Sequence, residues 1–152
     1  MHRLAPLFHL VVALWLAALP GAAQELSALA RLAPDRSAIT RADEGLVLQL
    51  SVSQPVPWRL RFLDAPPRLV IDTREVDWTG IAALPLPEDV VALRAGAFRP
   101  GWSRLVVELA GPVRLVTSEM QTPSDAAVIV VTLAPTDPES FATSAAQPDL
   151  PE

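Results

Sequence analysis

The segment AFRPGWSRLVVEL, residues 97–109, combines two aromatic side chains with two arginines around a Pro-Gly turn. Aromatic rings and guanidinium groups can hold a ligand without reacting with it, through stacking and charge-assisted hydrogen bonds. The same residue types also surround ordinary hairpin turns, where Pro-Gly makes the turn and a ring folds back over the sheet edge. The segment therefore predicts a hairpin and leaves open whether its tip binds a ligand.

Two residue types that dominate catalytic and metal sites are missing from most of the chain. There is no cysteine, and both histidines, His2 and His9, lie in the first twenty-three residues. Without them the remainder cannot form a Ser-His-Asp triad, a thiolate nucleophile or a zinc site with imidazole or sulfur ligands. We predict no catalytic residue, no metal ligand and no cofactor for this chain.

Carboxylates are the remaining candidates for catalysis, and Asp72, Glu75 and Asp77 lie close together in the sequence. A glycosidase needs two carboxylates held at a defined separation across the bond that is cut. Nothing in this spacing pairs them, and Arg74 lies among them. A solvated turn with partly balanced charge is the preferred interpretation.

Residues 1–23 have the pattern of a signal peptide. A short basic start precedes an apolar run at 10–19, and small residues at 21–23 suit cleavage before Gln24. We expect an exported, periplasmic protein that is free of the membrane after cleavage. The formal net charge of −5 argues against binding to nucleic acid or an anionic membrane surface, since both select basic patches.

From residue 24 to residue 134, apolar and polar residues alternate in short runs, which is typical of β-strands. The runs are 46–50, 58–62, 68–72, 104–109, 113–116 and 127–133, and the prolines between them leave no room for a long helix. Trp58 shares a face with Leu60 and Phe62, so it is predicted to be a core residue. Trp78 is also predicted to be structural.

Two parts of this region resemble each other at a distance of 57 to 59 residues. LVLQL (46–50) matches LVVEL (105–109), Pro-Val at 55–56 matches 112–113, and LVIDT (69–73) matches VIVVT (128–132). Each half then contributes about four strands. We expect an all-β sandwich of two related, roughly four-stranded antiparallel sheets that bury their Leu, Val and Ile faces.

Residues 135–152 are rich in proline, serine, alanine and acidic residues, with one aromatic residue, Phe141. This composition is typical of a linker or tail. We therefore expect the domain to end at residue 134, and the tail to lead to a further part of the protein or a separately encoded partner.

The phrases LDAPPRLVIDTREVDW (63–78) and LRAGAFRPGWSRLVVELAGPV (93–113) resemble the AMIN domain family. The family pattern is a "pprlVvD" strand followed by a "vR.g.f.p...RvVldl" segment, and the match spans about residues 26–133. The resemblance implies two symmetry-related four-stranded sheets in a periplasmic, non-catalytic module. Such a module binds peptidoglycan and directs an attached N-acetylmuramoyl-L-alanine amidase to the division septum, for cell-wall hydrolysis and cell separation. The zinc ion would belong to the amidase domain.

The resemblance does not decide whether the module is attached to an amidase. The chain is either part of such an amidase or a module that acts alone, and the module also occurs in pilus secretins. An alternative is a module that docks on divisome or other envelope proteins. An enzyme with its catalytic groups in this domain is the least favoured reading.

On this resemblance, aromatic faces would stack on sugar rings, while arginines and carboxylates would hold hydroxyls and peptide carboxylates. Alternation along 68–72 and 104–109 places an Arg-Val-acid stripe on one face of each strand, and we expect both stripes to face solvent. The alternative is two ordinary solvated sheet faces with cross-strand ion pairs. The predicted peptidoglycan-binding residues are Arg68, Asp72, Arg94, Phe98, Arg99, Trp102, Arg104 and Glu108.

Overall fold

The computed structural model describes residues 29–43 and 45–147. The predicted signal peptide at 1–23 and the start of the mature chain at Gln24 lie outside the described residues. Within the described ranges, no helix is long and apolar enough to cross a membrane.

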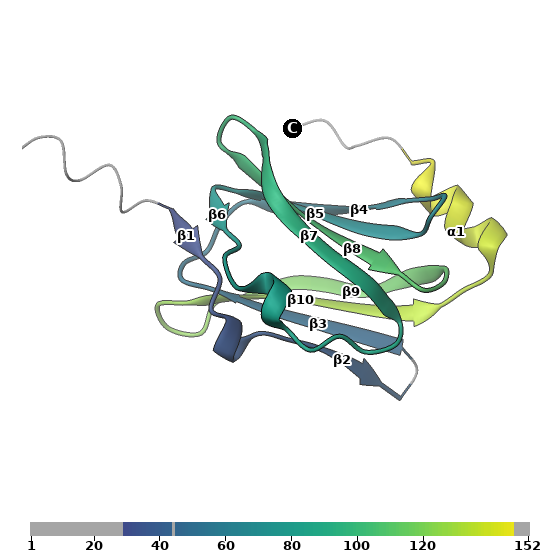
Figure 1. Cartoon of the computed structure of the whole chain (residues 1–152), viewed down its shortest axis with the longest axis horizontal. Coiled ribbons are helices and arrows are strands. Elements are labelled where there is room, and N and C mark those ends of the chain that lie inside the picture. The colour runs from purple at the N-terminus through teal and green to yellow at the C-terminus, as the bar shows by residue number, and fades with distance from the viewer. Residues whose placement is uncertain (1–28, 44, 148–152) are drawn as a thin grey trace, which may run out of the picture.

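Two four-stranded antiparallel sheets pack face to face (Figure 1), which confirms the expected all-β sandwich. The first sheet contains, in spatial order, β2 (Ala38–Ala42), β3 (Gly45–Val52), β10 (Ala127–Pro135) and β9 (Val113–Gln121). The second contains β4 (Trp58–Leu63), β5 (Arg68–Arg74), β8 (Trp102–Leu109) and β7 (Val90–Arg99).

The core lies between the sheets and follows the alternation of the sequence. Along β8 the side chains alternate between half-buried and buried, and Leu105, Val107 and Leu109 are at most 3% exposed. Each such side chain contributes about 1.5–3 kcal/mol when it is removed from water. Trp58, predicted to be a core residue, is half-buried and packs against this core from β4.

A segment with little regular structure covers one side of the sandwich. It contains β6 (Val76–Asp77), which pairs in parallel with β1 (Ala30–Arg31), and the short 3-10 helix η4 (Ile81–Ala83). A second 3-10 helix, η3 (Pro34–Arg36), joins β1 to β2. Trp78 and Ile81 are buried in the core cluster, so the structural role predicted for Trp78 is confirmed.

The topology explains the internal repeat. The first half of the domain forms the hairpins β2–β3 and β4–β5, the second half forms β7–β8 and β9–β10, and each sheet takes one hairpin from each half. The sequence match between β3 and β8 aligns structurally equivalent positions, because Leu48 and Val107 both point into the core. The match between β5 and β10 is one residue out of phase, because Leu69 points inward while Val128 is half-buried on the outer face.

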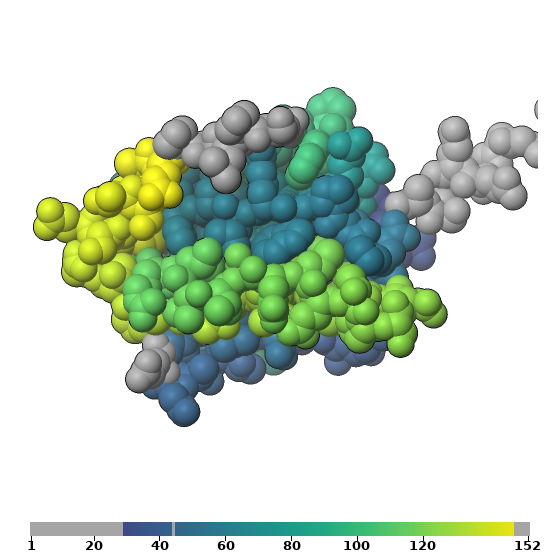
Figure 2. Space-filling view, turned by 180° about the vertical axis from the view of Figure 1, so that it is seen from behind, coloured from purple at the N-terminus to yellow at the C-terminus, as the bar shows by residue number. Residues whose placement is uncertain are grey.

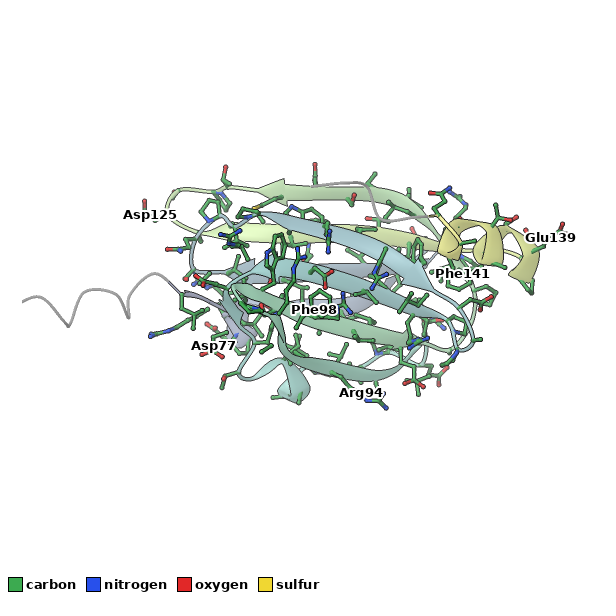
Figure 3. All side chains as sticks on the ribbon, turned by 90° about the horizontal axis from the view of Figure 1, so that it is seen from above. Asp77, Arg94, Phe98, Asp125, Glu139 and Phe141 are labelled. Carbon is green, nitrogen blue, oxygen red and sulfur yellow. The ribbon has the colours of Figure 1, made fainter. Side chains whose placement is uncertain are left out.

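The linker interpretation is wrong for residues 135–147. Pro135 ends β10, and α1 (Pro138–Ala145) follows, with the Asp137 carboxylate accepting a hydrogen bond from Ser140 N at 2.8 Å. Phe141 is 1% exposed, and its ring meets that of Phe62 edge-on at 5.4 Å. The helix therefore closes one end of the sandwich (Figures 2 and 3). Residues 148–152 of the predicted tail lie outside the described residues.

Gly45 offers a direct test of the strand packing. A Cβ atom there would meet the backbone of Leu133 and Ala134 at 2.9 Å or less, whereas one on Gly96 would meet nothing within 4 Å. Gly45→Ala is expected to lower the free energy of unfolding by about 2 kcal/mol, because β3 must move away from β10. Urea unfolding measures the loss. Gly96→Ala is the control, and an equal loss in both variants would contradict this packing.

Candidate functional site: an arginine and aromatic face

The outer face of the second sheet concentrates the positive charge of an acidic chain. The whole sequence has 17 acidic residues and 12 basic ones, yet the four strands of this sheet hold only two carboxylates, Asp72 and Glu108. They hold seven arginines: Arg59, Arg61, Arg68, Arg74, Arg94, Arg99 and Arg104. This distribution makes the sheet a candidate surface for an anionic ligand.

Asp72 organises the part of this face next to the β7–β8 turn. It lies opposite Arg104 in the β5–β8 register and opposite Arg59 in the β4–β5 register. Arg104 donates to it from Nε at 2.6 Å and from Nη2 at 3.0 Å, and Arg59 donates from Nε at 3.3 Å. Burial alone would raise the pKa of Asp72, but the hydrogen bonds and charges of the two arginines outweigh it and lower the pKa.

Aromatic rings and guanidinium groups pack together above Asp72. The Arg104 Cζ lies 3.4 Å from the centroid of the Phe98 ring. Trp102 has three guanidinium groups near its ring, with Cζ-to-centroid distances of 5.0 Å for Arg99, 5.5 Å for Arg59 and 5.8 Å for Arg74. We define the arginine cluster as the following residues: Arg59, Asp72, Arg74, Phe98, Arg99, Trp102 and Arg104.

The backbone of the β7–β8 hairpin explains this crowding. The pairing of β7 with β8 shifts between Ala97 and Arg99, and such a bulge inserts one extra residue and re-aims the side chains beside it. Phe98 and Arg99 therefore both reach the cluster, at 3.4 Å from Arg104 and 5.0 Å from Trp102 respectively. Gly101 has φ 77 in the turn, a conformation that glycine adopts without strain.

The structure brings some of the predicted binding residues together and separates others. Phe98, Arg99, Trp102 and Arg104 form the cluster with Asp72, as their sequence proximity suggested. Arg68, Arg94 and Glu108 lie toward the other end of β8. Glu108 lies four positions after Arg104, which is about 13 Å along a strand.

At that distal end the contacts are weaker or local. Arg94 is 74% exposed and its Nη2 lies 3.5 Å from the Glu108 carboxylate. Arg68 is opposite Glu108 in the register, but it donates to the carbonyl oxygens of Pro66 and Asp64 at 3.1 and 3.2 Å. In Figure 3, Arg94 and Phe98 are labelled at different positions along β7.

The prediction that the Arg-Val-acid stripe of β5 faces solvent is wrong. Val70 and Asp72 are each 1% exposed, because β5 is an inner strand and the long arginine side chains of β4 and β8 pack across Asp72. Asp72 therefore cannot reach out to a ligand and instead positions Arg59 and Arg104. The corresponding stripe on β8 remains half-buried.

Sequence reasoning missed Arg59 and Arg74 as members of the site. The signal for Arg59 was present, because the alternation that turns Trp58 and Leu60 toward the core must send Arg59 to the opposite face. Arg74 was treated only as a partner of nearby carboxylates. Its approach to Trp102 follows from their opposition in the β5–β8 register, which the sequence does not reveal.

A groove of about 700 Å³ adjoins the cluster. It runs between the β7–β8 hairpin and the segment around β6, and its lining is largely apolar. Phe98, Arg99 and Trp102 belong to both the groove and the cluster. Trp78 also lines it, and the indole N–H of Trp78 is buried without a hydrogen-bond partner among the described residues.

The three carboxylates considered for catalysis have separate roles. Asp72 is engaged by two arginines, and the Asp77 carboxylate accepts hydrogen bonds from Thr79 N at 2.9 Å and Thr79 Oγ1 at 2.7 Å. Glu75 occupies the turn between β5 and β6 with φ 41. Across the described ranges, no group of three or more His, Cys, Asp or Glu side chains could hold a metal ion.

No protein-family model matches the sequence, and no curated protein matches it.

Proposed function

We propose that this protein is a non-catalytic, periplasmic module that binds peptidoglycan. It acts by localisation: weak contacts repeated along a polymer raise the effective concentration of whatever is attached to the module. The resemblance to the AMIN family extends the proposal to an N-acetylmuramoyl-L-alanine amidase as the attached enzyme, directed to the division septum.

The observation that carries the proposal is the arginine cluster on one face of an acidic chain. Peptidoglycan offers carboxylates, amides and hydroxyls along a repeating polymer, and guanidinium groups bind carboxylates through paired hydrogen bonds. A face built from four neighbouring strands suits an extended polymer, since several repeats can contact it at once. Asp72 supports binding indirectly, because it fixes the two arginines on either side of it.

Cosedimentation with purified sacculi tests the proposal. Replacing both Arg99 and Trp102 with alanine is expected to weaken binding about tenfold, because one cation and the ring that packs beside it are lost. Arg59 and Arg104, which form the ion pairs with Asp72, are unchanged in this variant, so the fold should survive. The matched control replaces Arg114 and Val116, both exposed on β9 of the other sheet, and should bind as the wild type does.

Two results would contradict the proposal. Failure of the unmodified protein to cosediment would remove peptidoglycan as its ligand. Equal losses in the cluster variant and the β9 variant would show that the arginine cluster is not the binding surface.

A second candidate function is docking to an envelope protein, such as a divisome or pilus-secretin component. The supporting observation is β9, a nine-residue strand at the edge of the first sheet. Leu115 and Val116 are 37% and 46% exposed there, and an edge strand offers backbone groups to which a partner strand can add. Septal localisation in cells without binding to purified sacculi would favour this candidate.

A further inference from the structure

The edge of β7 that faces away from β8 forms one wall of the groove beside the arginine cluster. Among the described residues, β8 is the only strand that pairs with β7. In an antiparallel pair, every second residue turns its backbone N–H and C=O groups away from the partner strand. The part of β7 that lines the groove, residues 95–99, therefore presents backbone donors and acceptors to which a further strand can add.

This part of β7 lacks the features that usually protect an edge strand. Soluble proteins place charged residues, prolines or bulges on such edges. Residues 95–98 are Ala-Gly-Ala-Phe, all of them exposed, and the bulge in the strand begins only after Ala97. A Cβ atom on Gly96 would meet nothing within 4 Å, so no side chain bars the approach of another backbone there. The edge strand β4, by contrast, carries Arg59 and Arg61.

The opposite wall of the groove determines what can pair with this edge. It is formed by residues 75–79 and by Ile81, and the segment that contains them runs beside β7 (Figure 1). Leu29 and Phe98, which are 43% and 41% exposed, add apolar surface to the groove. Because this wall lies along β7, the groove accepts a single extended segment, whereas the edge strand of a second sandwich would bring a whole sheet with it.

Trp78 gives a separate indication that the groove has an occupant. It lines the groove and is 5% exposed, and its indole N–H is buried without a hydrogen-bond partner among the described residues. A buried donor without an acceptor is costly and is rare in folded proteins. A backbone carbonyl group of a bound strand is the kind of acceptor that this donor lacks.

The charges that line the groove favour a basic segment. They are the carboxylates of Glu75 and Asp77 and the guanidinium group of Arg99, and the last packs against the Trp102 ring at 5.0 Å from its centroid. The hydrogen bonds that Asp77 accepts from the side chain and backbone of Thr79 both end on Oδ1 and lower its pKa. This carboxylate is therefore ionised at neutral pH. The net charge of −5 on the whole chain also attracts a basic partner.

We propose that this groove binds an extended segment of a partner protein, in which apolar and basic residues alternate, and that the segment adds to β7 as a further strand. Its apolar side chains face the lining of the groove, and its basic side chains approach Glu75 and Asp77 as in cross-strand ion pairs. Such binding requires neither peptidoglycan nor the arginine cluster. It also uses a different edge from β9, which lies on the other sheet.

A titration with synthetic peptides tests the backbone pairing. The probe is a peptide of about seven alternating valine and lysine residues with blocked ends, long enough to follow the groove at about 3.4 Å per residue. It is expected to bind with a Kd below about 1 mM and to shift the amide NMR signals of residues 94–98. A second peptide has the same side chains but esters in place of its central amides. It should bind at least about tenfold more weakly, because it lacks N–H donors.

Two results of this titration would overturn the proposal. One is the absence of amide shifts on β7 at peptide concentrations up to about 1 mM. The other is equal affinity of the amide and ester peptides, because pairing with a strand edge depends on backbone hydrogen bonds.

The sign of the charge is tested by a peptide in which glutamate replaces every lysine. This peptide is expected to bind about fivefold more weakly than the valine-lysine peptide at low ionic strength, where exposed charges are least screened. Equal or tighter binding of the glutamate peptide would overturn the assignment of a basic partner.

Matched variants locate the binding site. Ala95→Arg places a long charged side chain in the groove and should weaken binding of the valine-lysine peptide at least about tenfold. Thr117→Arg adds the same charge at an exposed position of β9, an edge strand of the other sheet, and should leave binding unchanged. Equal losses in the two variants, or amide shifts on β9 in place of β7, would overturn the assignment of the site.

Sedimentation of the protein alone distinguishes a second copy of the chain from a different partner. A monomer is expected, because the wall opposite β7 leaves no room for a second sheet. A dimer that Ala95→Arg dissociates and Thr117→Arg does not would give the groove to a second copy of this chain, and would overturn the proposal.

Discussion

Replacing Phe141 with alanine is expected to lower the free energy of unfolding by about 4 kcal/mol, the usual cost of removing a large aromatic side chain from a core. Phe141 is 1% exposed and contacts the ring of Phe62 edge-on. Without it, α1 has no other fully buried side chain to hold it against the sandwich. Urea unfolding followed by circular dichroism measures the loss.

Two controls show whether the effect is packing. Phe141→Leu keeps an apolar side chain in the same place and should cost less than half as much. Thr143→Ala changes an exposed position of the same helix and is expected to change stability by no more than about 0.5 kcal/mol. A loss below about 1 kcal/mol for Phe141→Ala would mean that the helix is not part of the folded domain.

The predictable part of the fold is the part that local alternation determines. The runs around β3, β4, β5, β8, β9 and β10 were recognised from the sequence, because buried and exposed faces alternate with a period of two. The helix α1 was missed for a physical reason: one Phe141 among small and polar residues has no periodic pattern to detect. Its burial depends on Phe62, which lies 79 positions earlier in the chain.

The sequence predicted only the part of the candidate site that lies within one hairpin. Phe98, Arg99, Trp102 and Arg104 are neighbours in sequence, so their meeting needs only a hairpin. The sequence does not show that Asp72 would be buried beneath two arginines, since that depends on the order of β4, β5 and β8 in the sheet. Strand order and register are tertiary properties. They bury Asp72, which was expected to contact a ligand, and they place it where it positions two arginines.

The second large loss of stability is expected when Asp72 is replaced. Asp72→Asn is expected to lower the free energy of unfolding at pH 7 by about 3 kcal/mol, because the two arginines that pack across it lose the carboxylate with which both form ion pairs. Their side chains are 20% and 29% exposed, so water compensates part of the loss. Asp89→Asn is the matched control: its pairing with Arg41 has the same chemistry but is 40% and 60% exposed, and it should cost less than about 1 kcal/mol.

The pH dependence of the stability of Asp72→Asn tests whether the charge of Asp72 causes the loss. The arginines lower the pKa of Asp72 in the folded protein, so its ionised form stabilises the fold above the ordinary carboxyl pKa of about 4. This contribution is lost as the pH falls through the lower pKa of the folded state. The stability difference between the wild type and Asp72→Asn should therefore shrink in acid, as measured by urea unfolding from pH 7 downward. A difference that does not change with pH would assign the loss to packing, and Asp72 would then not hold the arginines by its charge.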